Sequence, residues 1–276
     1  VKGVAGYDLT RLIVGSEGTL AVITSITLRL IPKPAAKKTM VAFFRDISST
    51  VQSVSDIIRE KIVPTTLEFM DRLCMDCLRE DMGIDIPRET GAMLLIEVDG
   101  DEQLVDREAE KVREICARSG AIEFKTALDR EGAEKLWDAR RDVSPSLLKL
   151  RPGKISEDVV VPRSRMPELI SFLGELEDRY GLPIPSFGHA GDGNIHVNIM
   201  MDKDIPEEVR DGEAVVRELF EKVIELGGTI TGEHGIGITK APYMGIEFSK
   251  PALELMSRLK RAFDPNGILN PGKILL

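Results

Sequence analysis

All three histidines of this 276-residue chain stand close to glycines. His189 and His196 begin and end the stretch HAGDGNIH, and His234 lies in TGEHGIG. A histidine in a packed core usually lies in a helix or strand, where one ring nitrogen is satisfied by a neighbour. Imidazoles gathered in glycine-rich turns are more typical of side chains that are presented to a ligand.

The dipeptide Asp192–Gly193 predicts a hairpin turn between two short strands. If the loop is symmetric about this dipeptide, His189 pairs with His196, and directly opposed residues have Cβ atoms ~4.5–5.5 Å apart on one face. Asn198, two residues further along, points to the same face. Two imidazoles placed in this way can chelate one ion.

Glu233 directly precedes His234 and follows the predicted strand GGTIT. A carboxylate at this position would complete a set of two histidines and one carboxylate with an open position, which suits Zn²⁺, with Mn²⁺ and Fe²⁺ as alternatives. The other interpretation is that these are turn residues whose polar atoms are satisfied by the backbone. The spacing H-x6-H is not specific, and it leaves both interpretations open.

Strands and helices are predicted to alternate along the chain, and these elements must position the histidines and Glu233. Residues 18–34 alternate between apolar and polar side chains and predict a half-buried strand that ends at Pro32 and Pro34. Further strands are expected at 39–44, 91–98, 121–126, 155–161, 184–189, 195–200 and 228–231. Helices are expected at 47–62, 70–82, 101–119, 130–148, 164–180, 206–226 and 251–263. Because several strands alternate, we predict an α+β fold, an antiparallel sheet with helices packed on one side.

The composition excludes several classes of protein. A net charge of −9 provides no basic footprint for nucleic acid, so no nucleic-acid partner is expected. No apolar run approaches the ~20 residues of a membrane helix, so no transmembrane segment is expected. Three cysteines, an odd number, fit a reducing cytosol and predict a cytoplasmic protein. Cys74 and Cys77 lie in an amphipathic segment, which favours reduced structural thiols over a metal pair.

Four segments, VAGYDLTRLIVGSEGTLAVIT, GHAGDGNIHVN, TGEHGIG and LNPGKIL, occur in this order. Together they resemble the C-terminal part of the FAD-linked oxidases of the vanillyl-alcohol oxidase type. Within that family the chain is similar to the group of the glycolate oxidase flavoprotein subunit, D-lactate dehydrogenase and D-2-hydroxyglutarate dehydrogenase. The resemblance implies that residues 1–34 are the C-terminal remnant of an FAD-binding domain. Residues 35–276 would be the substrate-binding or cap domain, including a C-terminal helix and tail.

The resemblance also implies roles for individual residues. His189, His196 and Glu233 would hold the divalent metal, and His234 would be the catalytic base. Arg140, in the W-x-x-R segment LWDAR, would bind the substrate carboxylate.

Other residues would assist in substrate binding. Arg141 is an alternative to Arg140. Lys154 is a weaker candidate for the same carboxylate, and Asn198 would help to orient the substrate.

FAD is the cofactor that the resemblance implies, in the complete protein. The residues that would contact it are Ser16, Glu17, Gly18, Ile23 and Asn270. Glycines on both sides of Ser16 would allow the backbone to come close to a bulky ligand. Because the half that binds the FAD pyrophosphate does not precede these residues, we expect a fragment that is inactive alone and binds no stoichiometric FAD. The missing N-terminal FAD-binding half is then a partner.

The implied activity is the FAD-dependent, metal-assisted oxidation of a small 2-hydroxy acid, of the glycolate, D-lactate or D-2-hydroxyglutarate class, to the 2-oxo acid. An electron-acceptor protein or a quinone would take the electrons, and such a partner would bring a cytoplasmic protein to the membrane periphery. The apolar face of 18–34 would fold onto the cap domain, pair with a neighbouring chain such as a second copy in a homodimer, or stay poorly ordered. The alternatives are a metal-dependent hydrolase or non-haem iron enzyme, and a non-catalytic module that binds hydroxy acids.

Overall fold

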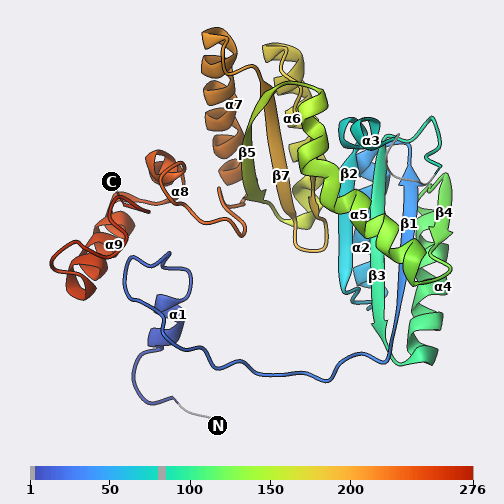
Figure 1. Cartoon of the computed structure of the whole chain (residues 1–276), viewed down its shortest axis with the longest axis horizontal. Helices are drawn as coiled ribbons and strands as arrows, with labels where there is room; N and C mark the ends of the chain where they lie inside the picture. The colour runs from blue at the N-terminus through green and yellow to red at the C-terminus, as the bar shows by residue number, and fades with distance from the viewer. Residues whose placement is uncertain (1–3, 80–84, 276) are drawn as a thin grey trace. The chain divides into compact units, whose positions relative to one another are not determined.

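The computed structural model describes residues 4–79 and 85–275, and these residues form two compact units (Figure 1). The sheet unit is the continuous stretch Pro32–Thr229. The terminal unit joins the two ends of the chain, Val1–Ile31 and Ile230–Leu276. The predicted boundary between residues 34 and 35 lies close to the boundary between Ile31 and Pro32 in the structure. Their assignment to FAD binding and substrate binding stays a prediction.

The sheet unit is built on seven antiparallel strands in the order β4-β1-β3-β2-β6-β7-β5. The strands are β1 (Ala36–Phe44), β2 (Thr66–Asp71), β3 (Ala92–Gly100), β4 (Glu123–Thr126), β5 (Gly153–Val160), β6 (Ser186–His189) and β7 (Asn194–Met201). The predicted α+β class with an antiparallel sheet is confirmed.

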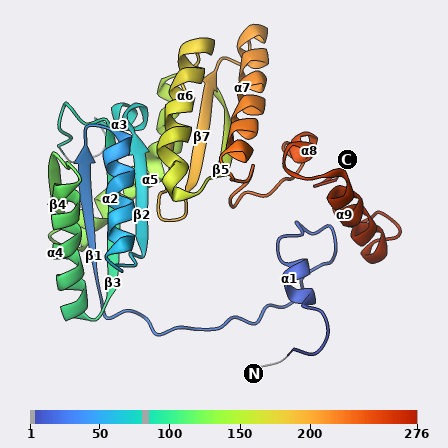
Figure 2. The same cartoon turned by 180° about the vertical axis from the view of Figure 1, so that it is seen from behind.

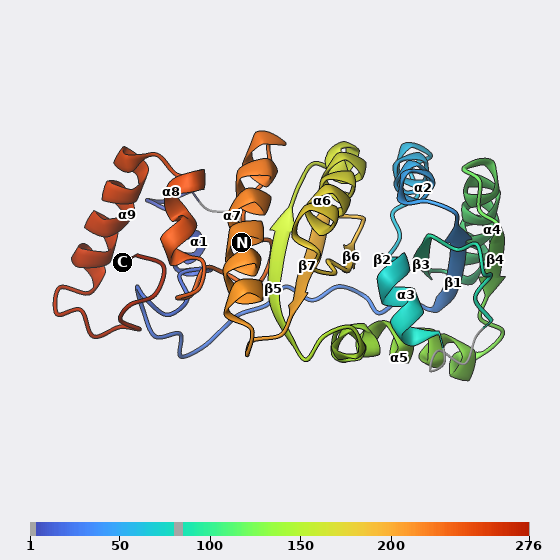
Figure 3. The same ribbon diagram turned by 90° about the horizontal axis from the view of Figure 1, so that it is seen from above.

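Four long helices cover one face of this sheet, as Figure 2 shows from that side. They are α2 (Ile47–Arg59), α4 (Glu102–Arg118), α6 (Met166–Tyr180) and α7 (Pro206–Glu225). Two further helices, α3 (Arg72–Leu78) and α5 (Arg130–Ser146), lie on the opposite face (Figure 3). Among residues 4–79 and 85–275, no helix combines the length and the apolar character needed to cross a membrane.

Aspartates determine where four of these helices begin. Asp46, Asp71, Asp101 and Asp129 each accept a hydrogen bond from the backbone N–H three residues later, at the first turn of α2, α3, α4 and α5. Such a cap satisfies a donor that has no partner within the helix. Asp71 is also the last residue of β2, and its carboxylate accepts from the Ser186 hydroxyl at 2.9 Å, which ties β2 to β6.

Three of the predicted elements are wrong. Residues 21–34 form no strand, and Val22, Ile26 and Leu28 are 72–75% exposed. An alternating pattern produces a strand only where another strand pairs with it, and no described strand pairs with this segment. The helix predicted at 70–82 begins only at Arg72, after a strand that was not predicted. The strand predicted at 228–231 is a single bridge from Thr229 to Val160.

A hydrophobic core lies between the sheet and the helices α3 and α5. Its members are Val41, Phe43, Met70, Cys74, Met75, Cys77, Leu78, Ile86, Met93, Leu95, Leu136, Ala139, Val143, Leu147, Phe187 and Met200. Cys74 and Cys77 therefore act as buried apolar side chains of α3, and Cys116 is buried on α4. Burial raises the pKa of the Cys116 thiol to about 12 and raises that of Cys74 well above its usual value.

The terminal unit contains the short helices α1 (Leu9–Ile13) and α8 (Met244–Glu247) and the longer α9 (Lys250–Phe263). Glu17 holds its two chain segments together. The Glu17 carboxylate accepts from the backbone N–H of Ile236 at 2.7 Å and of Gly237 at 2.8 Å, and its carbonyl accepts from the Asn270 side chain. A Cβ added at Gly235, where φ is +80°, would lie 2.7 Å from a Glu17 oxygen. This loop is thus a backbone nest around a carboxylate.

The state of the thiols gives a first test of this packing. In the native protein we expect Cys74, Cys77 and Cys116 to react with a disulfide reagent such as DTNB far more slowly than a free thiol, because all three are buried and burial raises their pKa. In urea all three should react at once, which is the control. Rapid labelling of the native protein, or a Cys74–Cys77 disulfide in its mass spectrum, would contradict this packing.

The Glu17 nest gives a second test. Glu17→Gln leaves one acceptor oxygen for two backbone N–H groups, so the loop 232–240 should open more readily. We expect its amides to exchange hydrogen for deuterium about 10–100-fold faster, the effect of losing a hydrogen bond to a charged group. Mass spectrometry of the peptide measures this rate. Glu254→Gln, at an exposed carboxylate on α9, should leave it unchanged. Equal rates in the two variants would show that Glu17 does not hold the loop.

Candidate active site

Polar side chains form two rows across the sheet face that α5 covers. In the first row Glu68 on β2 opposes His189 on β6, which opposes Asn194 on β7. In the second row His196 on β7 lies between Phe187 on β6 and Asp158 on β5. Residues two apart on a strand share a face, so both rows project toward α5.

The hairpin that carries the two histidines differs in register from the predicted one. His189 pairs with Asn194, and His196 pairs with Phe187, so the two histidines are not directly opposed. Gly193 is a turn residue with φ +77° that precedes β7, and its carbonyl accepts from the Val161 N–H at 3.0 Å. The four-residue loop 190–193 therefore replaces the expected symmetric turn.

The histidines nevertheless share a face. The register is displaced by two residues, and only a displacement by an odd number would send a side chain to the other face. His189 and His196 are diagonal neighbours, with ring centroids 5.4 Å apart and ring planes at 81°. The structure thus brings together two of the three predicted metal ligands.

Glu68 lies between His189 and Arg140. One carboxylate oxygen accepts from Nε of Arg140 at 2.8 Å and lies 2.7 Å from Nη2 in an ion pair, and the other contacts Nδ1 of His189. Burial opposes ionisation of Glu68, but the hydrogen bond with His189 and the charge of Arg140 outweigh it and lower the pKa of this carboxyl. The Arg140 guanidinium also lies over the Phe187 ring, 4.7 Å from its centroid.

Both ends of the W-x-x-R segment on α5 form hydrogen bonds with the sheet. Trp137 and Arg140 lie three residues apart, on one side of the helix. The Trp137 indole N–H donates to the Glu97 carboxylate on β3 at 3.1 Å, as Arg140 donates to Glu68 on β2. Arg141 instead forms ion pairs on the exposed side of the helix. Of the two arginines considered from the sequence, Arg140 is the one that faces the sheet.

The predicted residues Asn198 and Lys154 also belong to this face. Asn198 is buried beside His196, and its side-chain oxygen accepts from the Ser156 hydroxyl at 2.9 Å. The Lys154 ammonium donates to the Ser144 hydroxyl on α5 at 2.6 Å, and burial lowers its pKa.

Two acidic residues of this face were not found from the sequence. Asp158 is fully buried, accepts from the Asn194 amide at 2.6 Å, and lies 3.9 Å from Nδ1 of His196. Glu68 was missed because β2 was not predicted. The signal was present in TLEFMD, where a single acidic residue interrupts an apolar strand.

Glu233 and His234 are neighbours on the loop of the terminal unit that closes around Glu17, with His234 Nε2 3.9 Å from a Glu233 oxygen. The predicted metal set is thus divided, with two imidazoles in the sheet unit and the carboxylate in the terminal unit. Their combination stays a prediction.

The residues expected to contact FAD also lie in the terminal unit. Glu17, Gly18 and Asn270 are adjacent, and a Cβ at Gly18 would lie 3.8 Å from the Asn270 amide nitrogen. Ser16 is buried, whereas Ile23 is exposed. The Glu17 carboxylate and the Asn270 amide are engaged within the unit, and a role of these five residues in FAD binding stays a prediction.

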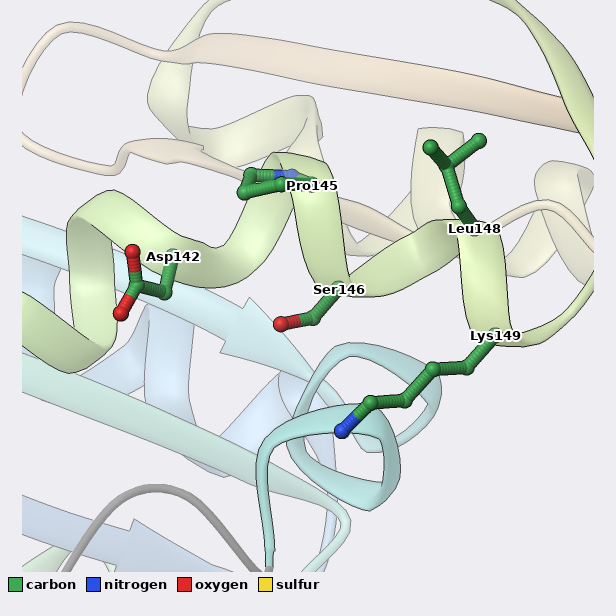
Figure 4. A pocket seen from close by; sticks show the side chains of 5 residues that line it. All are labelled: Asp142, Pro145, Ser146, Leu148 and Lys149. Carbon is green, nitrogen blue, oxygen red and sulfur yellow. The ribbon is translucent and has the colours of Figure 1, made fainter.

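Two hollows lie near these elements. One of about 440 Å³, on the outer side of α5, is lined by Asp142, Pro145, Ser146, Leu148 and Lys149 (Figure 4). None of the residues predicted to act in binding or catalysis lines it. Another, of about 260 Å³, has Glu68, His189 and Arg163 in its lining and therefore reaches the polar face.

Comparison with known proteins supports the predicted resemblance. Residues 33–274 match the family described as FAD linked oxidases, C-terminal domain. The chain is 45% identical over 273 residues to glycolate oxidase subunit GlcD of Bacillus subtilis (strain 168), with 99% of this chain and 58% of the relative covered. It is 35% identical over 277 residues to the probable mitochondrial D-lactate dehydrogenase of Danio rerio, with 99% and 55% covered. The chain spans little more than half the length of these relatives.

A solved structure of p-cresol methylhydroxylase with substrate bound has the same fold, with a TM-score of 0.66 at 18% identity over 88% of this chain and 53% of that chain. The resemblance predicted from the four sequence segments is therefore confirmed. This chain belongs to the family of FAD-linked oxidases, and residues 33–274 are their C-terminal domain.

Proposed function

We propose that this chain is the substrate-binding part of an enzyme that oxidises a small 2-hydroxy acid to the 2-oxo acid with FAD. The observation that carries the proposal is the polar sheet face, where a guanidinium and two imidazoles lie beside a buried carboxylate. The names of the relatives, glycolate oxidase and D-lactate dehydrogenase, support the same substrate class. Both substrates carry a carboxylate and an adjacent hydroxyl.

Arg140 binds the substrate carboxylate in this proposal. Glu68 occupies Nε and Nη2, so a carboxylate approaches the Nη1 side of the guanidinium. The Phe187 ring fixes the plane of the guanidinium. Lys154 and Asn198, on the same sheet face, help to orient the substrate.

The donor set of this face fits a divalent metal. Imidazole is a common ligand of zinc and iron, and a metal-bound histidine usually donates its other ring N–H to a carboxylate or carbonyl, as Nδ1 of His189 can to Glu68. His189 and His196, with Glu233 as the family resemblance suggests, would hold Zn²⁺, with Mn²⁺ or Fe²⁺ as alternatives. A bound ion would supply Lewis-acid polarisation of the 2-hydroxyl.

His234 takes the proton of the 2-hydroxyl on a ring nitrogen. FAD would supply the acceptor for the hydride from C2, with Ser16, Glu17, Gly18, Ile23 and Asn270 in its binding site. An acceptor protein or a quinone would then reoxidise it. The proton and the hydride together account for the two hydrogens that a 2-hydroxy acid loses.

The adjacent arginines test the substrate site in the complete protein. Arg140→Lys should raise KM for glycolate or D-lactate about 10–100-fold, because a lysine cannot reproduce the planar fork. Arg141→Lys, one residue away on the exposed side of the helix, should keep KM within about twofold. Steady-state kinetics with an artificial electron acceptor measures both. Equal KM values in the two variants would remove Arg140 from the substrate site.

His234→Gln tests the base. Turnover in the complete protein should fall about 10²–10⁴-fold, the usual contribution of general acid–base catalysis. Metal content by elemental analysis and the flavin absorbance spectrum should stay at their wild-type values. Loss of metal would instead make His234 a ligand, and unchanged turnover would exclude it from the reaction.

A further inference from the structure

Glu68 is a buried carboxylate whose partners come from two other elements. The residue is 6% exposed and lies on the central strand β2. Arg140 reaches it from α5, and His189 reaches it from β6. One carboxylate thus contacts both the proposed carboxylate-binding residue and one proposed metal ligand.

Strand pairing in the sheet and the packing of helix α5 together determine this arrangement. Glu68 and His189 are directly opposed on β2 and β6, so strand pairing alone brings them together. On the helix, the bond from Trp137 to Glu97 fixes the side of α5 that faces the sheet. Arg140, one turn further along, then has its Nε and Nη2 against Glu68.

The contact determines which nitrogen of His189 carries the proton. A neutral imidazole has one N–H and one lone pair, and the hydrogen bond made by one nitrogen selects the tautomer. An ionised carboxylate only accepts. Nδ1 of His189 therefore donates to Glu68, and Nε2 carries the lone pair that a metal ion or a proton needs.

The same carboxylate orients Arg140. Its Nε–H donates to one oxygen of Glu68 and its Nη2 forms an ion pair with the same oxygen, which fixes the rotation of the guanidinium and offsets its charge in a buried setting. The Nη1 side is then turned away from Glu68, as the proposed approach of a substrate carboxylate requires.

We infer that Glu68 is a positioning residue that holds His189 as the Nδ1–H tautomer and at the same time orients Arg140. What these two groups bind rests on the proposed function, whereas the tautomer is a property of this chain alone.

Glu97 provides a matched control. It is also 6% exposed, lies on the same sheet face, and accepts a hydrogen bond from α5, through Trp137. Its other partners are Thr39 and Lys37 on β1. If Glu68 only fastened α5 to the sheet, Glu68→Gln and Glu97→Gln would have the same effects.

The decisive measurement is long-range ¹H–¹⁵N NMR of the imidazoles at about pH 8.5, some two units above the ordinary histidine pKa of ~6.5. With three histidines in the chain, single His→Gln variants assign the signals. We expect His189 to carry its proton on Nδ1 in the wild type and in Glu97→Gln. In Glu68→Gln the amide oxygen accepts from Arg140, so the amide NH₂ faces His189 and donates to Nδ1. The proton of His189 should then move to Nε2.

Metal affinity gives a second readout on the same chain. Titration with Zn²⁺ should show about 10–100-fold weaker binding in Glu68→Gln than in Glu97→Gln, the usual cost of losing a partner of a metal-bound histidine.

The outcomes separate this inference from the proposed function. An Nε2–H or doubly protonated His189 in the wild type, or an unchanged tautomer in Glu68→Gln, overturns the role of Glu68 and leaves the proposed substrate class intact. The wild-type spectrum decides this even if Glu68→Gln does not fold. A wild type with the expected tautomers that binds no Zn²⁺ supports the role of Glu68 and removes the metal from the proposed function.

Discussion

The pairing of β2, β6 and β7 is the constraint on which the candidate site depends. These strands set Glu68 against His189 and His196 against Phe187, so the polar groups of three strands project from one face. A shift of one residue in any of these ladders would reverse the faces and turn the histidines toward the helices on the other side. The neighbouring strand β5 fixes the register further by pairing along the length of β7. The chemistry is therefore a property of the ladder, and the hairpin loop has little influence on it.

Helix α5 packs on this face of the sheet and partly buries its side chains. Its apolar residues Leu136, Ala139 and Val143 join the core, and Trp137 and Arg140 meet carboxylates on the sheet. Burying a charge is costly unless a partner accompanies it, and here Glu68 and Glu97 each have donors from more than one element. These contacts keep the guanidinium of Arg140 and the imidazole of His189 in fixed positions before any ligand binds.

The sequence contains enough information for the fold class and for part of the site. Alternating strands predicted the antiparallel sheet, and Asp192–Gly193 correctly indicated a hairpin with both histidines on one face. The exact pairing was not predicted, because the loop consists of residues 190–193 and is not centred on Asp192–Gly193. Residues 21–34 alternate as a strand does, yet pairing requires a second strand, which no local pattern supplies. Glu68 was missed because β2 runs directly into the helix capped by Asp71, and the helical pattern obscured the strand.

The contact between Glu17 and the loop at Ile236 joins residues 219 positions apart. A ribosome releases the chain from the N-terminus, and domains generally fold as units during synthesis. The sheet unit is continuous in sequence, so it can fold as soon as Thr229 has emerged. The segment around Glu17 is made before the sheet unit but has to wait for Gly237, and also for Lys260, whose ammonium donates to the Thr19 carbonyl, and for Asn270. During translation the segment around Glu17 thus becomes ordered only after the sheet unit that follows it. A ribosome that stalled before residue 230 would release a folded sheet unit in which the segment around Glu17 has no partner loop to order it.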